Sequence, residues 1–327
     1  MMKHTTVINR SSPARQLSAR KRQRGVGLVE VMVALVLVAI LFNGLMELLL
    51  NSRAAYSATE QITRLNENGR TAVDLLVTGL RRAGYRGGNS DISTIVGTLP
   101  PVTPAATCAD DDDSWGRMIA RGVYGINDAN TNYECIPSAA DADPDDAFYL
   151  RGDVLTLRYA SPWQVETADF EDDRIYLRSS LFEGKMFLGQ DTADSGNTVN
   201  DSPQRQHQLL AYSYYISETG RSCNGNAIPG LFREALNEDN EPEAEELISG
   251  VEDLQFRYNI GGRYVDANLV TDWADVTAVK LWVLARSECS ERSHTDTRTY
   301  LLGDQVYAPG DNFRRQLYST VVAMRNQ

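Results

Sequence analysis

One carboxylate stands in an apolar run that otherwise suits a membrane. The stretch "RQRGVGLVEVMVALVLVAILF" (22–42) contains Glu30 as its one acidic residue. A carboxylate at the middle of a membrane helix costs about 2.5–3.5 kcal/mol on insertion scales, and less near the helix end. The chemistry open to Glu30 is therefore ion pairing with a cation at the same depth. The alternative is that its side chain snorkels to the headgroups, since it lies only about 6 Å along a helix from Val26.

Four cysteines lie beyond the apolar run, at Cys108, Cys135, Cys223 and Cys289. An even number on the exported side of a membrane predicts disulfides, with three possible full pairings. The choice that is local in sequence joins Cys108 to Cys135 and Cys223 to Cys289, and the alternative is buried free thiols. No C-x-x-C motif occurs, which argues against zinc and thioredoxin-like sites.

Other candidate sites are weaker. The run "CADDDDSWG" (108–116) offers oxygen ligands for calcium at Asp110, Asp111, Asp112 and Asp113, and "DADPDD" (141–146) is similar. Neither has the spacing of an EF-hand, so solvated acidic loops are the favoured interpretation. The histidines are scattered, and no nucleophile constellation or G-x-S-x-G elbow is present; they are His4, His207 and His294. We therefore predict no enzymatic activity, no metal and no cofactor.

Charge is distributed unevenly along the chain. The formal charge is −12, but residues 1–25 hold seven basic residues and no acidic one, so the remainder carries −19. So acidic a body argues against nucleic-acid binding. The basic segment predicts a cytoplasmic N-terminus, and the apolar run of 25 residues (26–50) is long enough to cross a bilayer. Glu30 would lie near the cytoplasmic edge, with Asn43 and Glu47 near the other side. No A-x-A-like cleavage site follows, so we expect this segment to remain as an anchor.

The helical pattern continues beyond the membrane run. Residues 52–82 contain no proline, and apolar residues recur at near-helical spacing, at Ile62, Leu65, Ala72, Leu76 and Leu80. This predicts one helix over 26–82, about 85 Å long, whose second half lays an apolar stripe on a domain. Gly84, Gly87 and Gly88 then end it.

The rest of the chain predicts long loops followed by strands. Residues 89–150 are rich in Asp, Pro, Gly and Ala and read as loops fastened by Cys108 and Cys135. Strand-like runs then occupy 153–160, 174–180, 207–217, 230–236, 252–260, 276–286 and 314–324. In the sixth run Val279, Leu281 and Val283 alternate with other residues, which suits a sheet with one face on a helix. The predicted fold class is α+β, with the long helix as the spine of an antiparallel sheet.

The motif "RGVGLVEV" (24–31) resembles the processing site of type IV prepilins, in which a dedicated peptidase cuts after a glycine and methylates the new N-terminus. The resemblance assigns the cut to Gly25, the first mature residue to Val26 and the fifth, a glutamate, to Glu30. The family more often has phenylalanine at the position of Val26. After processing, the carboxylate of Glu30 in one subunit could face the new amine of another, and this pairing would favour assembly.

Further elements resemble those of PilW-like minor pilins and extend over most of the mature chain. They are "NENGRTAVDLLVTGLRRAGYRGG" (66–88), "LFREA" (231–235), "EELISGVEDLQFRYNIGG" (245–262) and "DNFRRQLYSTVVAMRNQ" (311–327). Where the family often has a cysteine just after "AGYRG" (83–87) this chain has Gly88, so a disulfide pairing cannot be carried over. The resemblance implies a type IV pilin-like fold and a minor pilin that primes assembly at the pilus tip, supporting twitching motility and adhesion.

The resemblance also implies a domain organisation and partners. We expect a leader peptide (1–25), a transmembrane assembly helix (26–50), an amphipathic helix half (51–84) and a β-rich globular domain (85–327). Expected partners are the prepilin peptidase, other minor pilins, the major pilin, a pilus-tip adhesin and the inner-membrane assembly platform. Expected localisation is the inner membrane with a periplasmic C-terminal domain, and then the pilus tip. The alternatives are a minor pseudopilin of type II secretion, similar to its J-type subunit, and an adhesin module that binds calcium or a host ligand.

Overall fold

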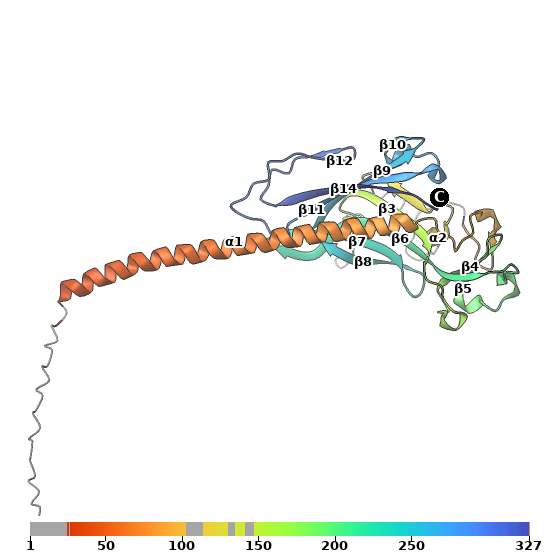
Figure 1. The fold of residues 1–327 in the computed structure, drawn as a ribbon, viewed down its shortest axis with the longest axis horizontal. Coiled ribbons are helices and arrows are strands. Elements are labelled where there is room, and N and C mark those ends of the chain that lie inside the picture. The colour runs from red at the N-terminus through yellow and green to blue at the C-terminus, as the bar shows by residue number, and fades with distance from the viewer. Residues whose placement is uncertain (1–24, 26, 103–113, 130–134, 141–146, 327) are drawn as a thin grey trace, which may run out of the picture. The chain divides into compact units, whose positions relative to one another are not determined.

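The computed structural model describes residues 25, 27–102, 114–129, 135–140 and 147–326. It consists of two units, one that runs to Tyr56 and one that begins at Ser57 (Figure 1). Each unit is considered below by itself.

Helix α1 (Leu28–Arg82) is continuous over 55 residues. The predicted end at Arg82 is confirmed, and the predicted start is wrong by two residues, because the carbonyl of Gly27 already accepts the first helical hydrogen bonds from Glu30 and Val31. At the other end Gly84 takes a φ of 77°, which a glycine adopts without strain. Its N–H leaves the helix and donates to the carbonyl of Arg158 at 2.9 Å.

In the first unit most of the surface of α1 is apolar. The large apolar side chains from Leu28 to Leu50 are between 46 and 77 % exposed. So large an exposed apolar surface is stable only in apolar surroundings. Within the described residues, α1 is the one helix long and apolar enough to cross a membrane.

In the second unit one stripe of α1 is buried. Leu65, Ala72, Leu76 and Leu80 are 0–6 % exposed and, apart from Leu65, belong to the main core cluster. The predicted stripe was wrong at its start, because Ile62 is 37 % exposed. Gly69 is explained by packing, since a Cβ there would overlap the ring of Tyr318. The hydroxyl of that tyrosine donates to Oδ1 of Asn66 at 3.0 Å.

The larger of the two main sheets has eight strands, in the order β1-β5-β4-β6-β3-β2, with β7 paired to β6 and β8 to β7. All of these pairs are antiparallel except β1 with β5. The strands are β1 (Ile95–Val96), β2 (Val123–Ile126), β3 (Arg151–Ala160), β4 (Ile175–Ser179), β5 (Gly184–Leu188), β6 (Arg205–Cys223), β7 (Asn226–Leu236) and β8 (Pro242–Ser249).

The smaller sheet has the order β10-β9-β11-β14 and is antiparallel throughout. Its strands are β9 (Val251–Ile260), β10 (Arg263–Val265), β11 (Ala278–Arg286) and β14 (Arg315–Ala323). A two-stranded ribbon, β12 (Tyr300–Leu302) with β13 (Gln305–Tyr307), lies in the segment between β11 and β14. Short 3₁₀ turns complete the elements, at Ile92–Thr94, Thr167–Asp169, Gly189–Asp191, Ser195–Asn197, Ala267–Leu269 and Trp273–Asp275.

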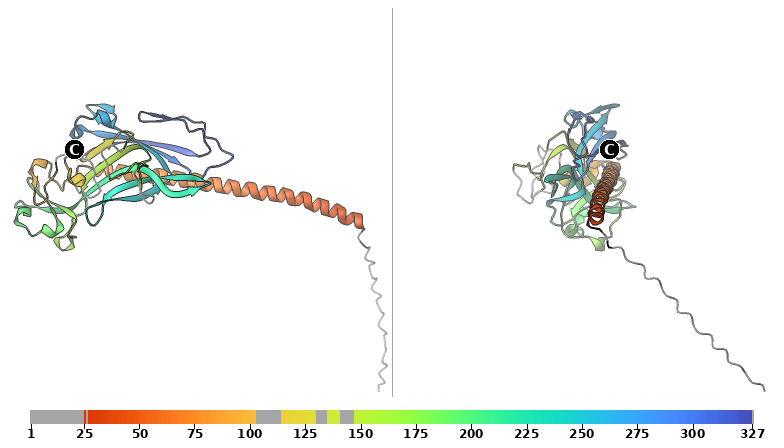
Figure 2. Two further views of the ribbon diagram at one scale, coloured as in Figure 1. Left: turned by 180° about the vertical axis from the view of Figure 1, so that it is seen from behind. Right: turned by 90° about the vertical axis from the view of Figure 1, so that its left-hand side faces the viewer.

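The main core lies where the second half of α1 meets both sheets (Figures 1 and 2). The predicted alternation in β11 is confirmed, because Val279, Leu281 and Val283 are fully buried in this core. The opposite face of β11 is covered by the ribbon, where Leu284 packs against Tyr300 and Leu302. These features confirm the predicted α+β fold with the helix as its spine.

The interpretation of residues 89–150 as loops was wrong in part. This region contains β1, β2 and the short helix α2 (Ser114–Arg117). Trp115 is 1 % exposed and packs in a second cluster with Ile136, Tyr215 and Phe232. Trp115 is therefore a core residue. The sequence did not predict this, because short elements between polar stretches give little periodicity.

Two buried carboxyls lie where the two sheets meet. Asp153 in β3 accepts a hydrogen bond from the N–H of Phe256 in β9 at 2.7 Å and another from the N–H of Asp128 at 2.9 Å. Asp253 pairs with Arg151 at 3.1 Å. Burial raises the pKa of Asp153 to about 8 and that of Asp253 to about 6, in spite of these partners.

The raised pKa values predict a fold that weakens as the solution becomes more alkaline. The folded protein keeps the Asp153 carboxyl protonated at pH values above the unfolded pKa of about 3.9. The contribution of Asp153 to the free energy of unfolding is therefore largest at low pH and is lost as pH rises through its folded pKa. The free energy of unfolding should fall by about 1 kcal/mol between about pH 7 and pH 9. Urea unfolding at a series of pH values measures this. Burial lowers the pKa of His207, so this histidine has the opposite effect on stability. That change takes place below the pH range of the experiment.

Asp153→Asn is the matched variant. It should be less stable, because the two N–H groups contact different carboxyl oxygens and an amide has only one oxygen that can accept. Its stability should nevertheless not change between these pH values. The same slope in this variant would contradict the assignment.

Candidate functional site

The residues of the predicted processing motif lie at the start of α1. Gly25 is exposed and precedes the helix, and a Cβ there would meet no atom within 4 Å. Glu30 lies in the first helical turn, where its carboxylate faces the positive end of the helix dipole. Val26 lies outside the described residues.

The side chain of Glu30 is exposed and has no ion-pair partner among the described residues. An unpaired carboxylate at the edge of an apolar segment gains most from an external amine or cation, because each charge then offsets the desolvation of the other. The arrangement can therefore act as a contact with another molecule. It contains no nucleophile and no acid–base pair.

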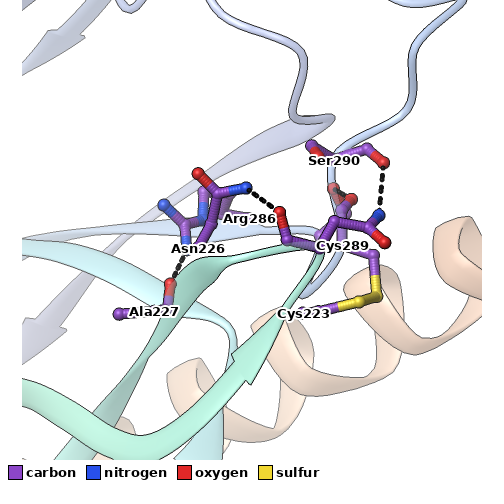
Figure 3. The surroundings of a disulfide bond; sticks show 8 residues. Cys223, Asn226, Ala227, Arg286, Cys289 and Ser290 are labelled. Carbon is purple, nitrogen blue, oxygen red and sulfur yellow. Dashed lines mark hydrogen bonds between the residues drawn. A yellow bond between two sulfur atoms is a disulfide. The ribbon is translucent and has the colours of Figure 1, made fainter.

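A disulfide between Cys223 and Cys289 joins the two sheets (Figure 3). Cys223 ends β6, and Cys289 follows β11 by three residues. Two hydrogen bonds reinforce the joint, one from Arg286 to the carbonyl of Ala227 at 2.7 Å and one from Asn224 to the carbonyl of Ser290 at 3.2 Å. This is the pairing that is local in sequence. Cys135 is also disulfide-bonded and 7 % exposed, and Cys108 lies outside the described residues.

Replacement of both Cys223 and Cys289 by serine should lower the free energy of unfolding by about 4 kcal/mol, the chain-entropy value for a loop of this length, since the two cysteines are separated by 66 residues. Urea unfolding of residues 53–327 without reductant would measure the loss. Thiol alkylation of the unreduced wild-type protein is the control and should label neither cysteine. A double variant within 1 kcal/mol of wild type would contradict the expected role.

The other predicted sites are not assembled in the described part of the chain. There, no group of three or more His, Cys, Asp or Glu side chains could hold a metal ion. The calcium candidates Asp110, Asp111, Asp112 and Asp113 lie outside it, as does His4. His207 is 1 % exposed in β6, and its Nδ1 lies 3.2 Å from the carbonyl oxygen of Trp163. Burial lowers its pKa and so favours its neutral form, as in a core residue.

A buried ion cluster is a feature that sequence analysis missed. The side chain of Arg315, at the start of β14, is 0 % exposed, and its guanidinium bonds Glu252 of β9 at 2.9 Å and Asp311 at 2.6 Å. Asp296, 1 % exposed, lies 3.6 Å from the same guanidinium. Burial opposes ionisation of Asp296, but hydrogen bonds from Arg298 and Tyr300 hold its pKa at about 2. The cluster fastens the segment that carries the ribbon, residues 287–314, to the smaller sheet.

Comparison with known proteins gives a structural likeness and two family matches. The structure is similar to that of a type IV-like pilin from Thermus thermophilus. The similarity covers 80 % of this chain and 97 % of the other chain, at 13 % sequence identity and a TM-score of 0.37. No curated protein matches the sequence. Residues 213–326 match the family of type IV pilus-assembly protein W, and residues 20–42 match the prokaryotic N-terminal methylation motif.

The two family matches include several of the features described above. The first extends from the middle of β6 through β14 and so includes the smaller sheet, the ribbon and the ion cluster. The second includes Gly25 and Glu30. The C-terminal third of the chain is therefore similar to the type IV pilus-assembly protein W family, and its N-terminal segment is similar to the prokaryotic N-terminal methylation motif.

Proposed function

We propose that the protein is a minor pilin that is processed at Gly25, anchored in the inner membrane by residues 26–50, and used to prime assembly of a type IV pilus. The observation that carries the proposal is the position of Glu30 in the first turn of an apolar helix, where its carboxylate is exposed and has no ion-pair partner among the described residues. The family match of residues 213–326 supports a pilin role. We propose that this role is structural.

The proposed mechanism follows from electrostatics in an apolar medium. Cleavage after Gly25 creates an amine at Val26, which carries a positive charge. When two subunits lie side by side in the membrane, Glu30 of one meets the amine of the other, and the desolvation of both charges is offset. An isolated subunit retains an unpaired charge, so association is favoured over separation.

The proposal includes the partners and the localisation. The prepilin peptidase would act on the boundary between residues 1–25 and the rest of the chain. Residues 51–84 and 85–327 would form the periplasmic body, and this body would contact other minor pilins, the major pilin and a tip adhesin at the pilus tip. The assembly platform would engage the membrane segment.

Glu30→Leu tests the proposal, because it removes the charge and makes insertion easier. We expect a protein that is still cut and still anchored, yet gives at least about tenfold fewer surface pili than wild type, corresponding to the loss of one charge pair in the membrane. Counting pili after shearing measures the effect. Intact mass of the extracted protein, expected to start at Val26 with one methyl group, shows that processing is unchanged.

The controls separate processing from assembly. A bulky substitution at Gly25 should leave residues 1–25 attached and also abolish pili, whereas Val38→Leu should change neither property. Normal piliation by Glu30→Leu would refute the assembly contact. Intact pili with a loss of enzyme secretion would instead indicate a type II secretion pseudopilin.

A further inference from the structure

The membrane half of α1 carries a second polar feature besides Glu30. Asn43, Glu47 and Asn51 recur every four residues and so lie on one side of the helix, which we call the polar stripe. All three side chains are exposed, and the large side chains around them, from Phe42 to Leu50, are apolar and 46–68 % exposed. The stripe therefore interrupts an apolar surface.

Helical geometry separates the polar stripe from Glu30. Glu47 follows Glu30 by 17 residues, which places it about 26 Å further along the axis and about 100° around it. Hydrocarbon is about 30 Å thick. With Glu30 at the cytoplasmic edge, Glu47 lies in the outer leaflet and on another side of the helix, so one neighbouring helix cannot cover both residues in the same way.

The polar groups of the stripe are incompletely satisfied by their own helix. The amide nitrogen of Asn43 donates to the carbonyl of Ala39 at 3.0 Å, which leaves its side-chain oxygen free to accept. No ion pair involves Glu47 within the described residues. An ionisable group in a membrane is costly without a partner, so the missing partner is expected from outside the chain.

We propose that the polar stripe binds the membrane helix of a different pilin subunit, one that presents a lysine or arginine in the outer leaflet. This rests on the proposed function only for the presence of α1 in a membrane beside other subunits. The carboxylate of Glu47 accepts from the donor, and the carbonyl oxygen of Asn43 accepts one turn away. The small residue Gly44 borders the stripe and lets the two backbones approach.

Charge complementarity excludes a second copy of this chain as the occupant. Residues 26–52 contain no lysine, arginine or histidine. A parallel second copy in register would place Glu47 against Glu47, and the two like charges would repel. The occupant is therefore a heterologous subunit, and the stripe gives the chain a position next to one particular neighbour.

Site-specific photocrosslinking of the full-length protein in cells tests this proposal. A photoreactive phenylalanine analogue at Ile40 lies about 20° from Glu47 around the helix, and the same analogue at Val38 lies on the opposite side, about 180° away. We expect the Ile40 position to give an adduct with another membrane subunit, identified by mass spectrometry, and the Val38 position to give little of it.

Substitutions in the stripe then give the decisive comparison. Glu47→Leu should reduce the Ile40 adduct about threefold to tenfold, the range for one interhelical hydrogen bond in a membrane. Glu47→Gln, which still hydrogen-bonds, should reduce it less. Leu49→Gln, on the far side of the helix, is the matched control and should leave it unchanged.

Three outcomes would overturn the proposal: an adduct of the chain with itself, equal adducts from Ile40 and Val38, or an Ile40 adduct unaffected by Glu47→Leu. Intact mass of the same samples reports cleavage at Gly25. A failure of the proposed pilin function therefore appears as an uncut chain, whereas a failure of the polar stripe appears as a cut chain without the expected adduct.

Discussion

A fragment that begins at Tyr85 is expected to aggregate, whereas a fragment of residues 53–327 is expected to be soluble and folded. The shorter fragment lacks Leu65, Leu76 and Leu80, whose side chains are 0–6 % exposed in the whole protein. Burial of each leucine contributes about 1.5–3 kcal/mol, so the three together match much of the net stability of about 5–15 kcal/mol that a domain has. Their loss also exposes apolar sheet surface.

Soluble yield, gel filtration and circular dichroism of the two fragments measure this difference. Point variants of residues 53–327 refine it. Leu76→Ala should cost about 2–5 kcal/mol in urea unfolding, because it leaves a cavity in the core. Ile62→Ala is the matched control and should cost far less, since Ile62 is 37 % exposed. Equal stability of the fragment that begins at Tyr85 and the longer one would disprove the role of α1 as a spine.

Arg315→Ala should destabilise the second unit by about 3–5 kcal/mol, the usual effect of removing one partner from a buried ion pair. The variant removes the guanidinium that Glu252 and Asp296 share. These carboxylates, 6 % and 1 % exposed, then keep only Arg286 at 3.7 Å and Arg298 at 2.9 Å as their ion-pair partners among the described residues. Urea unfolding of residues 53–327 measures the loss. Protease cleavage within 287–314 should increase as well, because this segment is fastened through the cluster.

The adjacent arginine supplies the control for this experiment. Arg314 pairs with Glu291 at 2.8 Å, but its side chain is 32 % exposed. Arg314→Ala should therefore cost only about 0–1 kcal/mol. The double variant Arg315→Met with Glu252→Gln should recover part of the stability that Arg315→Ala loses. In the double variant Glu252 no longer leaves a buried charge without its partner. Equal effects of Arg315→Ala and Arg314→Ala would contradict the importance of burial.

The long periodic elements could be predicted from the sequence. The end of α1 at Arg82 was predicted correctly, and each of the seven strand-like runs corresponds to a strand. These segments have an apolar pattern that repeats over several turns or residue pairs. The exposure of Ile62 could not be predicted, because it depends on where the sheets stop along the helix.

The missed strands are short or polar. β8 has the sequence "PEAEELIS", in which glutamates and a proline mask the strand pattern of an edge. The ribbon strands β12 and β13 are three residues long each. The ion cluster was missed because its members are far apart in sequence, with Glu252 preceding Arg315 by 63 residues.

At the candidate site the sequence suggested one of the two polar features of α1 and not the other. The motif around Gly25 and Glu30 is local, so its spacing alone suggested it. The four-residue spacing of Asn43, Glu47 and Asn51 was present in the sequence too, but it becomes one surface only because α1 is continuous through residues 43–51.

The contact between β14 and α1 has a consequence for biogenesis. Tyr318 bonds Asn66 across a separation of 252 residues, and Asn326 donates to the carbonyl of Arg81 across 245. During synthesis the segment 57–82 thus emerges long before the strand that packs against it, and loop closure over such distances is slow. The unit can close only when β14 has been made. A chain interrupted before residue 315 stays open and accessible to proteases, so completion of the fold reports completion of synthesis.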